Sequence, residues 1–314
     1  MSITVWAFFC LFIILMLALD LGVFHKKPHA ISVKEALSWT LVWVILSILF
    51  CIVIYFMYRS NHPNGPEAVM QYLTGYLIEE SLSVDNIFVM ALIFNYFHIH
   101  REFQHRILFW GILGAIVMRG FMITIGIVLI QHFSWMVYVF GALLLITAIR
   151  MMFWNQDKLE PEENFLLNLA KKILPLDIKY KGGHFFTKLN GKTAMTPIFV
   201  TLLIVESMDL VFAVDSIPAI IAITQDPFIV FTSNIFAILG LRSLYFALAG
   251  LMNKFEYMKV SLTFILAFIG IKMVLSHHLP IPTAVSLVVI ILILVIGIGA
   301  SIIKSKHIHI NKSY

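Results

Sequence analysis

Six acidic side chains are concentrated in two stretches of sequence that are otherwise strongly apolar. A carboxylate at the centre of a lipid bilayer costs roughly 2.5–3.5 kcal/mol, so six of them are tolerated only where something offsets that cost. A buried base, protonation, hydration or a bound cation can each do so. The first stretch contains Glu79, Glu80 and Asp85, and the second contains Glu206, Asp209 and Asp215.

Basic residues within the apolar stretches are too few to pair with all of these acids. Three are available, Arg119, Arg242 and Lys272, and Lys272 stands near the end of its stretch, where its ammonium group can reach the membrane surface. The surplus of negative charge favours a pathway for cations. A seventh acid, Asp20, stands close to two lysines, so a surface ion pair explains it more simply than a role as a gate.

The spacing of the acids restricts how they can share an ion. Glu206 and Asp209 are three residues apart, so they lie on one face of a helix and can line one cavity. Glu79 and Asp85 are six apart, as are Asp209 and Asp215, which separates each pair by about 120° and about 9 Å on a straight helix. Either the helices unwind locally, which the proline three residues after Asp215 favours in the second stretch, or the acids mark two successive depths along a path.

The polar residues near these acids indicate the class of ion. Carboxylate, amide and hydroxyl oxygens suit Mg²⁺, Ca²⁺ and Mn²⁺, whereas the apolar stretches lack the histidines and paired cysteines that zinc or copper would use. A thioether from Met90 or Met208 would favour Mn²⁺, although methionine is also a common packing residue. The amide and hydroxyl groups are those of Ser81, Ser83, Asn86, Ser207 and Ser216.

Composition and hydropathy define the elements that must position these groups. Hydrophobic residues make up 61% of the 314-residue chain and charged residues 12%, a balance that excludes an ordinary soluble domain. The apolar stretches have the length of about twenty residues that a helix needs to cross a bilayer. They predict an all-α polytopic membrane protein, a single membrane domain over 1–314. The nine predicted spans are 3–22, 37–57, 72–97, 107–130, 134–154, 197–223, 228–250, 258–276 and 281–303.

The distribution of lysine and arginine predicts the orientation. Most of the 22 basic residues fall on the loops of one face, which includes the long amphipathic connection 155–196, while Arg59 alone falls on the other. Because short cytoplasmic loops are rich in these residues, we expect the N-terminus outside and the C-terminus in the cytoplasm. A basic face beside anionic lipid also explains the net charge of +5 without a nucleic-acid partner. An interfacial helix is the simplest interpretation of the connection.

The two acidic stretches resemble each other and indicate an internal repeat. Each has an acid, five residues, an aspartate, an amide or hydroxyl residue and an isoleucine, starting at Glu79 and at Asp209. Arg119 matches Arg242 in the spans that follow. Spans 3–5 (72–154) therefore correspond to spans 6–8 (197–276), and three crossings per unit place the second copy upside down, as in many secondary transporters.

At these residues the sequence resembles the TerC family of integral membrane proteins, and within it the Alx-like branch. The most specific marks are Glu-Glu-Ser-Leu-Ser-Val-Asp-Asn at 79–86, Glu-Ser-Met-Asp-Leu-Val-Phe-Ala-Val-Asp-Ser-Ile-Pro-Ala at 206–219 and Leu-Arg-Ser-Leu-Tyr-Phe at 241–246. The resemblance covers essentially the whole chain. It implies a manganese exporter that protects the cell from excess Mn²⁺, in a family tied in some members to tellurite resistance or alkaline pH.

The resemblance, together with the shared face of the Glu206 helix, implies a set of metal-binding residues. The expected ligands are Glu79, Asp85, Asn86, Glu206, Asp209, Asp215 and Ser216. The expected supporting residues are Glu80, Ser83, Ser207, Met208, Arg119, Arg242 and Asp20.

We therefore expect a secondary transporter in the cytoplasmic membrane that exports Mn²⁺, with exchange against protons as a hypothesis. Mn²⁺ would be its cargo, and no permanently bound cofactor is expected. The alternatives are an exporter of amino acids or another small solute, and a partner that delivers metal or forms part of a stress-resistance complex. Signatures of intramembrane proteases are absent, so we do not expect an enzyme. The oligomeric state stays open.

Overall fold

Nine helices make up most of the part of the chain that the structure describes. The computed structural model describes residues 2–19, 32–59, 63–153, 174–177, 180, 182–189, 191–248, 257–276 and 281–311. Its elements are α1 (Ile3–Leu19), α2 (Val33–Met57), α3 (Gly65–Tyr96), α4 (Arg101–His132), α5 (Met136–Phe153), β1 (Phe186–Leu189), β2 (Lys192–Met195), α7 (Pro197–Ile221), α8 (Pro227–Leu248), α9 (Met258–Leu275) and α10 (Thr283–Asn311). Each predicted span therefore contains a helix, and α3 and α4 begin several residues earlier than expected.

Several of these helices can cross a membrane. Among the described residues, six are long and apolar enough, namely α2, α4, α5, α7, α8 and the 283–301 part of α10. Helix α1 is apolar but has 17 residues, and α3 has 32 residues but carries the first group of acids. The chain is thus a polytopic membrane protein. The count of nine spans and the orientation of the termini stay predictions.

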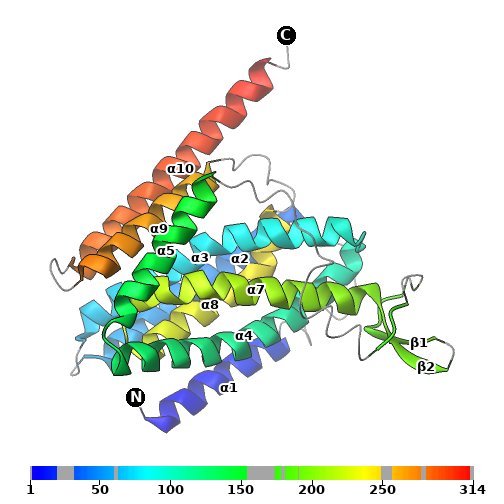
Figure 1. Cartoon of the computed structure of the whole chain (residues 1–314), viewed down its shortest axis with the longest axis horizontal. Coiled ribbons are helices and arrows are strands. Elements are labelled where there is room, and N and C mark those ends of the chain that lie inside the picture. Colours follow the sequence, from blue (N-terminus) through cyan, green and yellow to red (C-terminus); the bar gives the residue numbers. More distant parts are fainter. Residues whose placement is uncertain are drawn as a thin grey trace.

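Helices α3, α4, α7 and α8 form the centre of the molecule. Both α3 and α4 pack against α7 and α8, and the axes of α3, α4 and α7 are roughly aligned in Figure 1. Helix α8 is buried along nearly its whole length. Helices α5 and α9 pack against each other at a steep angle to this centre, and α10 lies along α9 (Figure 1). The acidic helices α3 and α7 are therefore both central.

Two apolar clusters attach the outer helices to the centre. Aromatic rings join α1 and α2 to α8, with ring centroids 6.2 Å apart for Phe9 and Phe236 and 4.9 Å apart for Phe50 and Phe236. Aliphatic side chains such as Leu144 of α5 and Ile265 of α9 form the second cluster with α7. Burying such side chains against each other fixes the helices around the central polar residues.

Small residues let α5 and α9 approach closely. A Cβ atom on Gly141 would lie 3.1 Å from the carbonyl oxygen of Gly270, and a Cβ atom on Gly270 would lie 3.1 Å from that of Gly141. Close backbone contact of this kind is a common way for membrane helices to associate, because lipid provides little hydrophobic drive between them. The α5–α9 pair is therefore built as a tightly packed unit.

Both acidic helices are continuous, which decides between the two arrangements left open by the sequence. Helix α3 runs without a break from Gly65 to Tyr96, past all its acids. Helix α7 continues through Pro218 to Ile221, so the local unwinding that the proline favoured, one of the two alternatives, is not found in this structure. The proline lies in the last turn, where the loss of one backbone hydrogen bond is tolerated. Within each pair of acids six residues apart, the two acids therefore lie at different depths along their helix.

A short hairpin precedes the second acidic helix. Strands β1 and β2 pair antiparallel, with Phe186 opposite Met195 and Leu189 opposite Lys192, and Gly191 in the turn has a φ of 78°. The Thr196 side chain then accepts a hydrogen bond from the backbone of Phe199 at 3.4 Å and caps α7. These strands were not predicted from the sequence. The expected interfacial helix of the 155–196 connection lies largely outside the described residues, as does Asp20.

Candidate functional site

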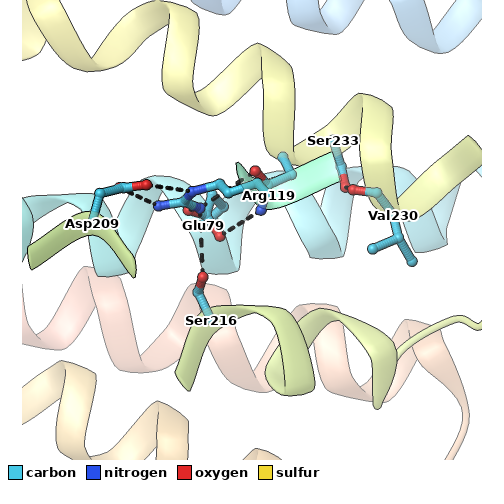
Figure 2. A network of polar contacts seen from close by, with 7 residues as sticks. Glu79, Arg119, Asp209, Ser216, Val230 and Ser233 are labelled. Carbon is cyan, nitrogen blue, oxygen red and sulfur yellow. Dashed lines mark hydrogen bonds and ion pairs between the residues drawn. The ribbon is translucent and has the colours of Figure 1, made fainter. Parts of the chain in front are cut away.

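A buried arginine joins the two acidic helices. Arg119 of α4 has 1% of its surface exposed and forms an ion pair with Glu79 of α3. On its other side it forms a two-pronged contact with Asp209 of α7, from Nη2 to Oδ1 at 2.8 Å and from Nε to Oδ2 at 3.2 Å. Figure 2 shows the guanidinium between the two carboxylates. The acidic stretches predicted to face each other do meet, through a base.

Two neutral side chains complete this cluster. Asn234 of α8 donates from Nδ2 to Oε2 of Glu79 at 3.1 Å and accepts from Nη1 of Arg119 at 3.3 Å. The hydroxyl of Ser216, on α7, accepts from the same Nη1 at 3.5 Å (Figure 2). All five side chains are at least nine-tenths buried, and they come from α3, α4, α7 and α8. We call Glu79, Arg119, Asp209, Ser216 and Asn234 the central cluster.

The central cluster contains more negative than positive charge. With Glu79 and Asp209 ionised, two carboxylates face one guanidinium, which leaves a formal charge of −1. Taking each ion out of water costs several kcal/mol, and only good pairing geometry and further hydrogen bonds repay that cost. The hydrogen bonds of Asn234 offset part of this desolvation cost. A site of this composition attracts cations.

A cavity adjoins the central cluster on the Asp209 side. Its volume is about 20 Å³, which is room for roughly one water molecule. Glu206, Asp209 and Arg242 contribute its charged groups, and Met90 contributes a thioether. The prediction that Glu206 and Asp209 line one cavity is confirmed. The rest of the lining is Leu108, Gly111, Ile112, Ala115, Val205, Ile238 and Leu241.

The carboxylate of Glu206 lies directly against helix α4. A Cβ atom added to Gly114 would be 2.4 Å from Oε1 and 2.5 Å from Oε2 of Glu206, and one added to Gly111 would be 3.7 Å from Oε1. Only glycine leaves this space at position 114. The glutamate of α7 is thereby placed beside the same helix that carries Arg119.

Asp85 and Asp215 lie away from the central cluster and interact with the α5–α9 pair. Asp215 accepts a hydrogen bond from the hydroxyl of Thr147 on α5 at 2.8 Å. Asp85 interacts electrostatically with Lys259 in the first turn of α9. Asp85 and Asp215 thus face the outer pair of helices, whereas Glu79 and Asp209 face Arg119.

Four polar atoms of α3 are buried without a hydrogen bond in the described part of the chain. They are Oε1 of Gln71, Oε2 of Glu80, Oγ of Ser83 and Oδ1 of Asn86. Ser83 and Asn86 share the face of α3 that carries Glu79, because residues four and seven apart lie in line. Glu80 points toward α8, where a Cβ atom on Gly240 would be 3.9 Å from its Oε1. Buried polar atoms of this kind are places where water or an ion can bind.

The remaining expected residues have local roles. The Ser207 hydroxyl donates to the carbonyl of Leu203 at 2.7 Å, and Met208 packs among apolar side chains. Lys272, which the sequence placed near a membrane surface, is instead 7% exposed and donates to the hydroxyl of Ser286 on α10 at 2.9 Å. It is bonded to a neutral group and not to one of the acids.

No point in the described ranges gathers three or more histidine, cysteine, aspartate or glutamate side chains in a metal-binding arrangement. The structure brings Glu79, Asp209 and Ser216 together, and it places Glu206 beside them. Asp85 and Asp215 interact elsewhere. The seven expected ligands are thus not all gathered at one point in this conformation.

Two partners of the acids were missed by reasoning from the sequence. Asn234 and Thr147 are single polar residues in apolar helices, and nothing in their spacing links them to residues 155 and 68 positions away. A polar residue in a membrane helix is itself a signal, since its side chain needs a partner in the bundle interior. Both would have been found by searching each span for such residues.

Comparison with known proteins identifies the family. Residues 64–308 match the family model described as the integral membrane protein TerC family. An uncharacterised membrane protein of Myxococcus xanthus is 49% identical over 302 residues, which cover 96% of this chain and 93% of that protein. A protein of Escherichia coli (strain K12) named as a membrane-bound redox modulator, Alx, is 44% identical over 285 residues, which cover 90% of this chain and 89% of its own length.

No solved structure matches the chain significantly. The family match extends from the start of α3 to the end of α10 and so includes both acidic helices, the central cluster and the cavity. The resemblance expected from the acidic motifs is thereby confirmed: the chain belongs to the TerC family of integral membrane proteins.

Proposed function

We propose that this protein is a secondary transporter that exports divalent metal ions, with Mn²⁺ as its cargo. The observation that carries the proposal is the central cluster, where carboxylates from two helices converge in the bundle interior with more negative than positive charge. Ionisable residues inside a membrane bundle usually mark an ion or substrate path. Transport rather than catalysis is the activity we propose.

The atoms available at the cluster and the cavity suit Mn²⁺. Glu79, Asp209 and Glu206 offer carboxylate oxygens, and Ser216 and Asn234 offer a hydroxyl and an amide. These are the hard ligands of Mg²⁺, Ca²⁺ and Mn²⁺, and the thioether of Met90 in the cavity wall adds a softer group that favours Mn²⁺ among the three. The family resemblance supports the same ion and supplies the direction of transport.

The packing of the central helices supports the proposed inverted repeat. If α3, α4 and α5 correspond to α7, α8 and α9, a pseudo-two-fold axis exchanges the α3–α8 contact with the α4–α7 contact and leaves the α5–α9 contact in place. All three pairs pack against each other. Glu79 and Asp209 then occupy equivalent positions on either side of the axis, as expected of a site at a repeat interface.

The second acids extend the proposed path to other depths. Asp85 and Asn86 lie beyond Glu79 on α3, and Asp215 lies beyond Asp209 on α7. In a repeat of opposite topology, these two directions lead to opposite faces of the membrane. We propose that Asp85 and Asp215 pass the ion between the central cluster and the two sides of the cytoplasmic membrane, with the C-terminus in the cytoplasm.

The experiment that tests this proposal is Mn²⁺ flux through the purified protein in liposomes, with and without a pH gradient. Wild type moves Mn²⁺, and Glu79→Gln and Asp209→Asn abolish most of the flux, because each removes one of the converging carboxylates. Glu67→Gln is the matched control, since Glu67 lies on the same helix near its N-terminus and contacts Gln71 instead of the cluster.

The outcomes of this experiment distinguish Mn²⁺ export from the alternative functions. Flux that depends on the pH gradient supports exchange with protons. Wild-type protein that is folded but moves no Mn²⁺ contradicts the proposal and favours a role in metal delivery or in a resistance complex. Movement of basic amino acids in place of Mn²⁺ would assign the protein to another class of exporter.

A further inference from the structure

We propose that Arg119 is a tethered counter-cation, which occupies the ion site of the empty transporter and is displaced by the metal ion. The inference rests on the proposed function and deepens it. It gives Arg119 a role beyond neutralising charge.

The contacts of Arg119 use the atoms that an ion would need. Its guanidinium binds both carboxylate oxygens of Asp209 and one oxygen of Glu79, and its Nη1 also contacts the oxygens of Ser216 and Asn234. A divalent ion bound to the same carboxylates would lie where the guanidinium lies, and the two positive groups would repel each other. Binding of the metal ion and the pairing of Arg119 are therefore mutually exclusive.

A displaced arginine needs another partner in the bundle interior, because an unpaired buried charge is strongly unfavourable. Glu206, which lies on the same helix as Asp209, is the nearest candidate. It precedes Asp209 by three residues on α7, so the Cβ atoms of the two acids are about 5–6 Å apart. Its carboxylate lies against α4 at Gly114, on the helix that carries Arg119, and the two acids line one cavity. Glu206 is thus the acid to which we expect Arg119 to move when a metal ion takes its place at Asp209.

This arrangement solves a problem that any exporter has after it releases its cargo. The metal-free transporter must reorient to the side from which it takes up the ion. Without Arg119, its two carboxylates would be left uncompensated in a bundle interior whose apolar side chains include Ile123, Ile217 and Ile220. With Arg119 in place, the empty site has hydrogen bonds to both carboxylates and half of the positive charge that a divalent ion would supply. Arg119 therefore makes the return step fast without requiring a second metal ion.

The test compares two modes of transport in liposomes that contain the purified full-length protein. Net export is measured as loss of Mn²⁺ into metal-free buffer, and exchange is measured as uptake of radioactive Mn²⁺ by liposomes loaded with unlabelled Mn²⁺. Exchange requires only the loaded transporter to reorient, whereas net export also requires the empty one to return. We expect Arg119→Gln to slow net export by about tenfold or more and to leave exchange close to wild type.

Two further variants make the result decisive. Arg119→Lys keeps the charge but cannot reproduce the two-pronged contact with Asp209, so its ratio of net export to exchange falls between those of wild type and Arg119→Gln. It also serves as the test if Arg119→Gln does not fold. Arg106→Gln is the control, because Arg106 is exposed and binds the carbonyl of Gly183 far from the cluster. Both transport modes should be unchanged in it.

Several results would overturn the inference. Arg119 is not a counter-cation if a folded Arg119→Gln protein retains net export, or if it loses exchange together with net export. The same conclusion follows if Arg119→Lys leaves the ratio of the two modes unchanged. These results differ from a failure of the proposed function, in which the wild-type protein itself shows neither mode.

Discussion

Removal of Arg119 should make the stability of the protein depend on Mn²⁺. In the wild type, Glu79 and Asp209 are 0% and 4% exposed and both pair with this one guanidinium. The Arg119→Gln variant leaves their charges facing each other, and breaking a buried pair in this way typically costs about 3–5 kcal/mol. We therefore expect its melting temperature, measured on detergent-solubilised protein without divalent ions, to fall well below that of the wild type.

Added Mn²⁺ should restore most of this loss. An ion that binds only the folded protein stabilises it by about 2.7 kcal/mol when present at 100 times its dissociation constant. The vacant carboxylates of the variant bind the ion directly, whereas in the wild type the ion must first displace Arg119 from Asp209. The rise in melting temperature with Mn²⁺ should accordingly be larger, and begin at lower concentration, in the variant.

The assay is a series of thermal unfolding measurements over a range of Mn²⁺ concentrations, with Mg²⁺ and Ca²⁺ as parallel series. The double variant Glu79→Gln/Arg119→Gln is the control, because it lacks both the competitor and one ligand, and it should respond weakly. An equal response of wild type and Arg119→Gln would refute competition between the arginine and the ion. A variant as stable as wild type without any metal would refute the reasoning about buried charge.

Three other changes test separate parts of the account. Glu206→Gln removes the second partner proposed for Arg119, so the Mn²⁺ concentration that gives half-maximal flux should rise severalfold while the stability of the metal-free protein changes little. Gly270→Ala places a Cβ atom 3.0 Å from Cγ of Leu145 and should lower the free energy of unfolding by about 1–3 kcal/mol in thermal or denaturant unfolding, since the α5–α9 crossing has no spare room. Replacing both Cys10 and Cys51 with serine should leave Mn²⁺ flux unchanged, because both are free thiols outside the central cluster, and a loss of flux would favour a redox role instead.

The sequence was sufficient for the helices and for the location of the charged residues. Apolar stretches of bilayer length predict the positions of the nine helices found among the described residues, because a helix that satisfies its own backbone hydrogen bonds is required in lipid whatever its neighbours are. The three-residue spacing of Glu206 and Asp209 likewise predicts their shared cavity, since it depends only on the geometry of one helix.

The partners of the acids depend on packing between helices and could not be read from spacing. Arg119 is 40 residues from Glu79 and 90 from Asp209, and the sequence offers Arg242 as an equally plausible partner. The choice is made by how α4 packs against α3 and α7. Local sequence patterns do not determine such contacts, so the cluster became visible only in three dimensions.

The hairpin before α7 was missed for a different reason. Asn190-Gly191 lies between two short segments and is a strong signal for a two-residue hairpin turn. The expected interfacial helix rests on the amphipathic middle of the long connection, and the turn signal lies beyond that pattern. Strands outside the apolar spans therefore have to be sought independently of the search for membrane helices.

The central claim is that a divalent ion takes the place of Arg119 between Glu79 and Asp209. An experimental structure determined with saturating Mn²⁺, in which the anomalous scattering of manganese locates the ion, tests it most directly. The account predicts manganese bound by carboxylate oxygens of both residues, with the Arg119 guanidinium moved toward Glu206. Manganese bound elsewhere, with Arg119 still paired to both carboxylates, would contradict it.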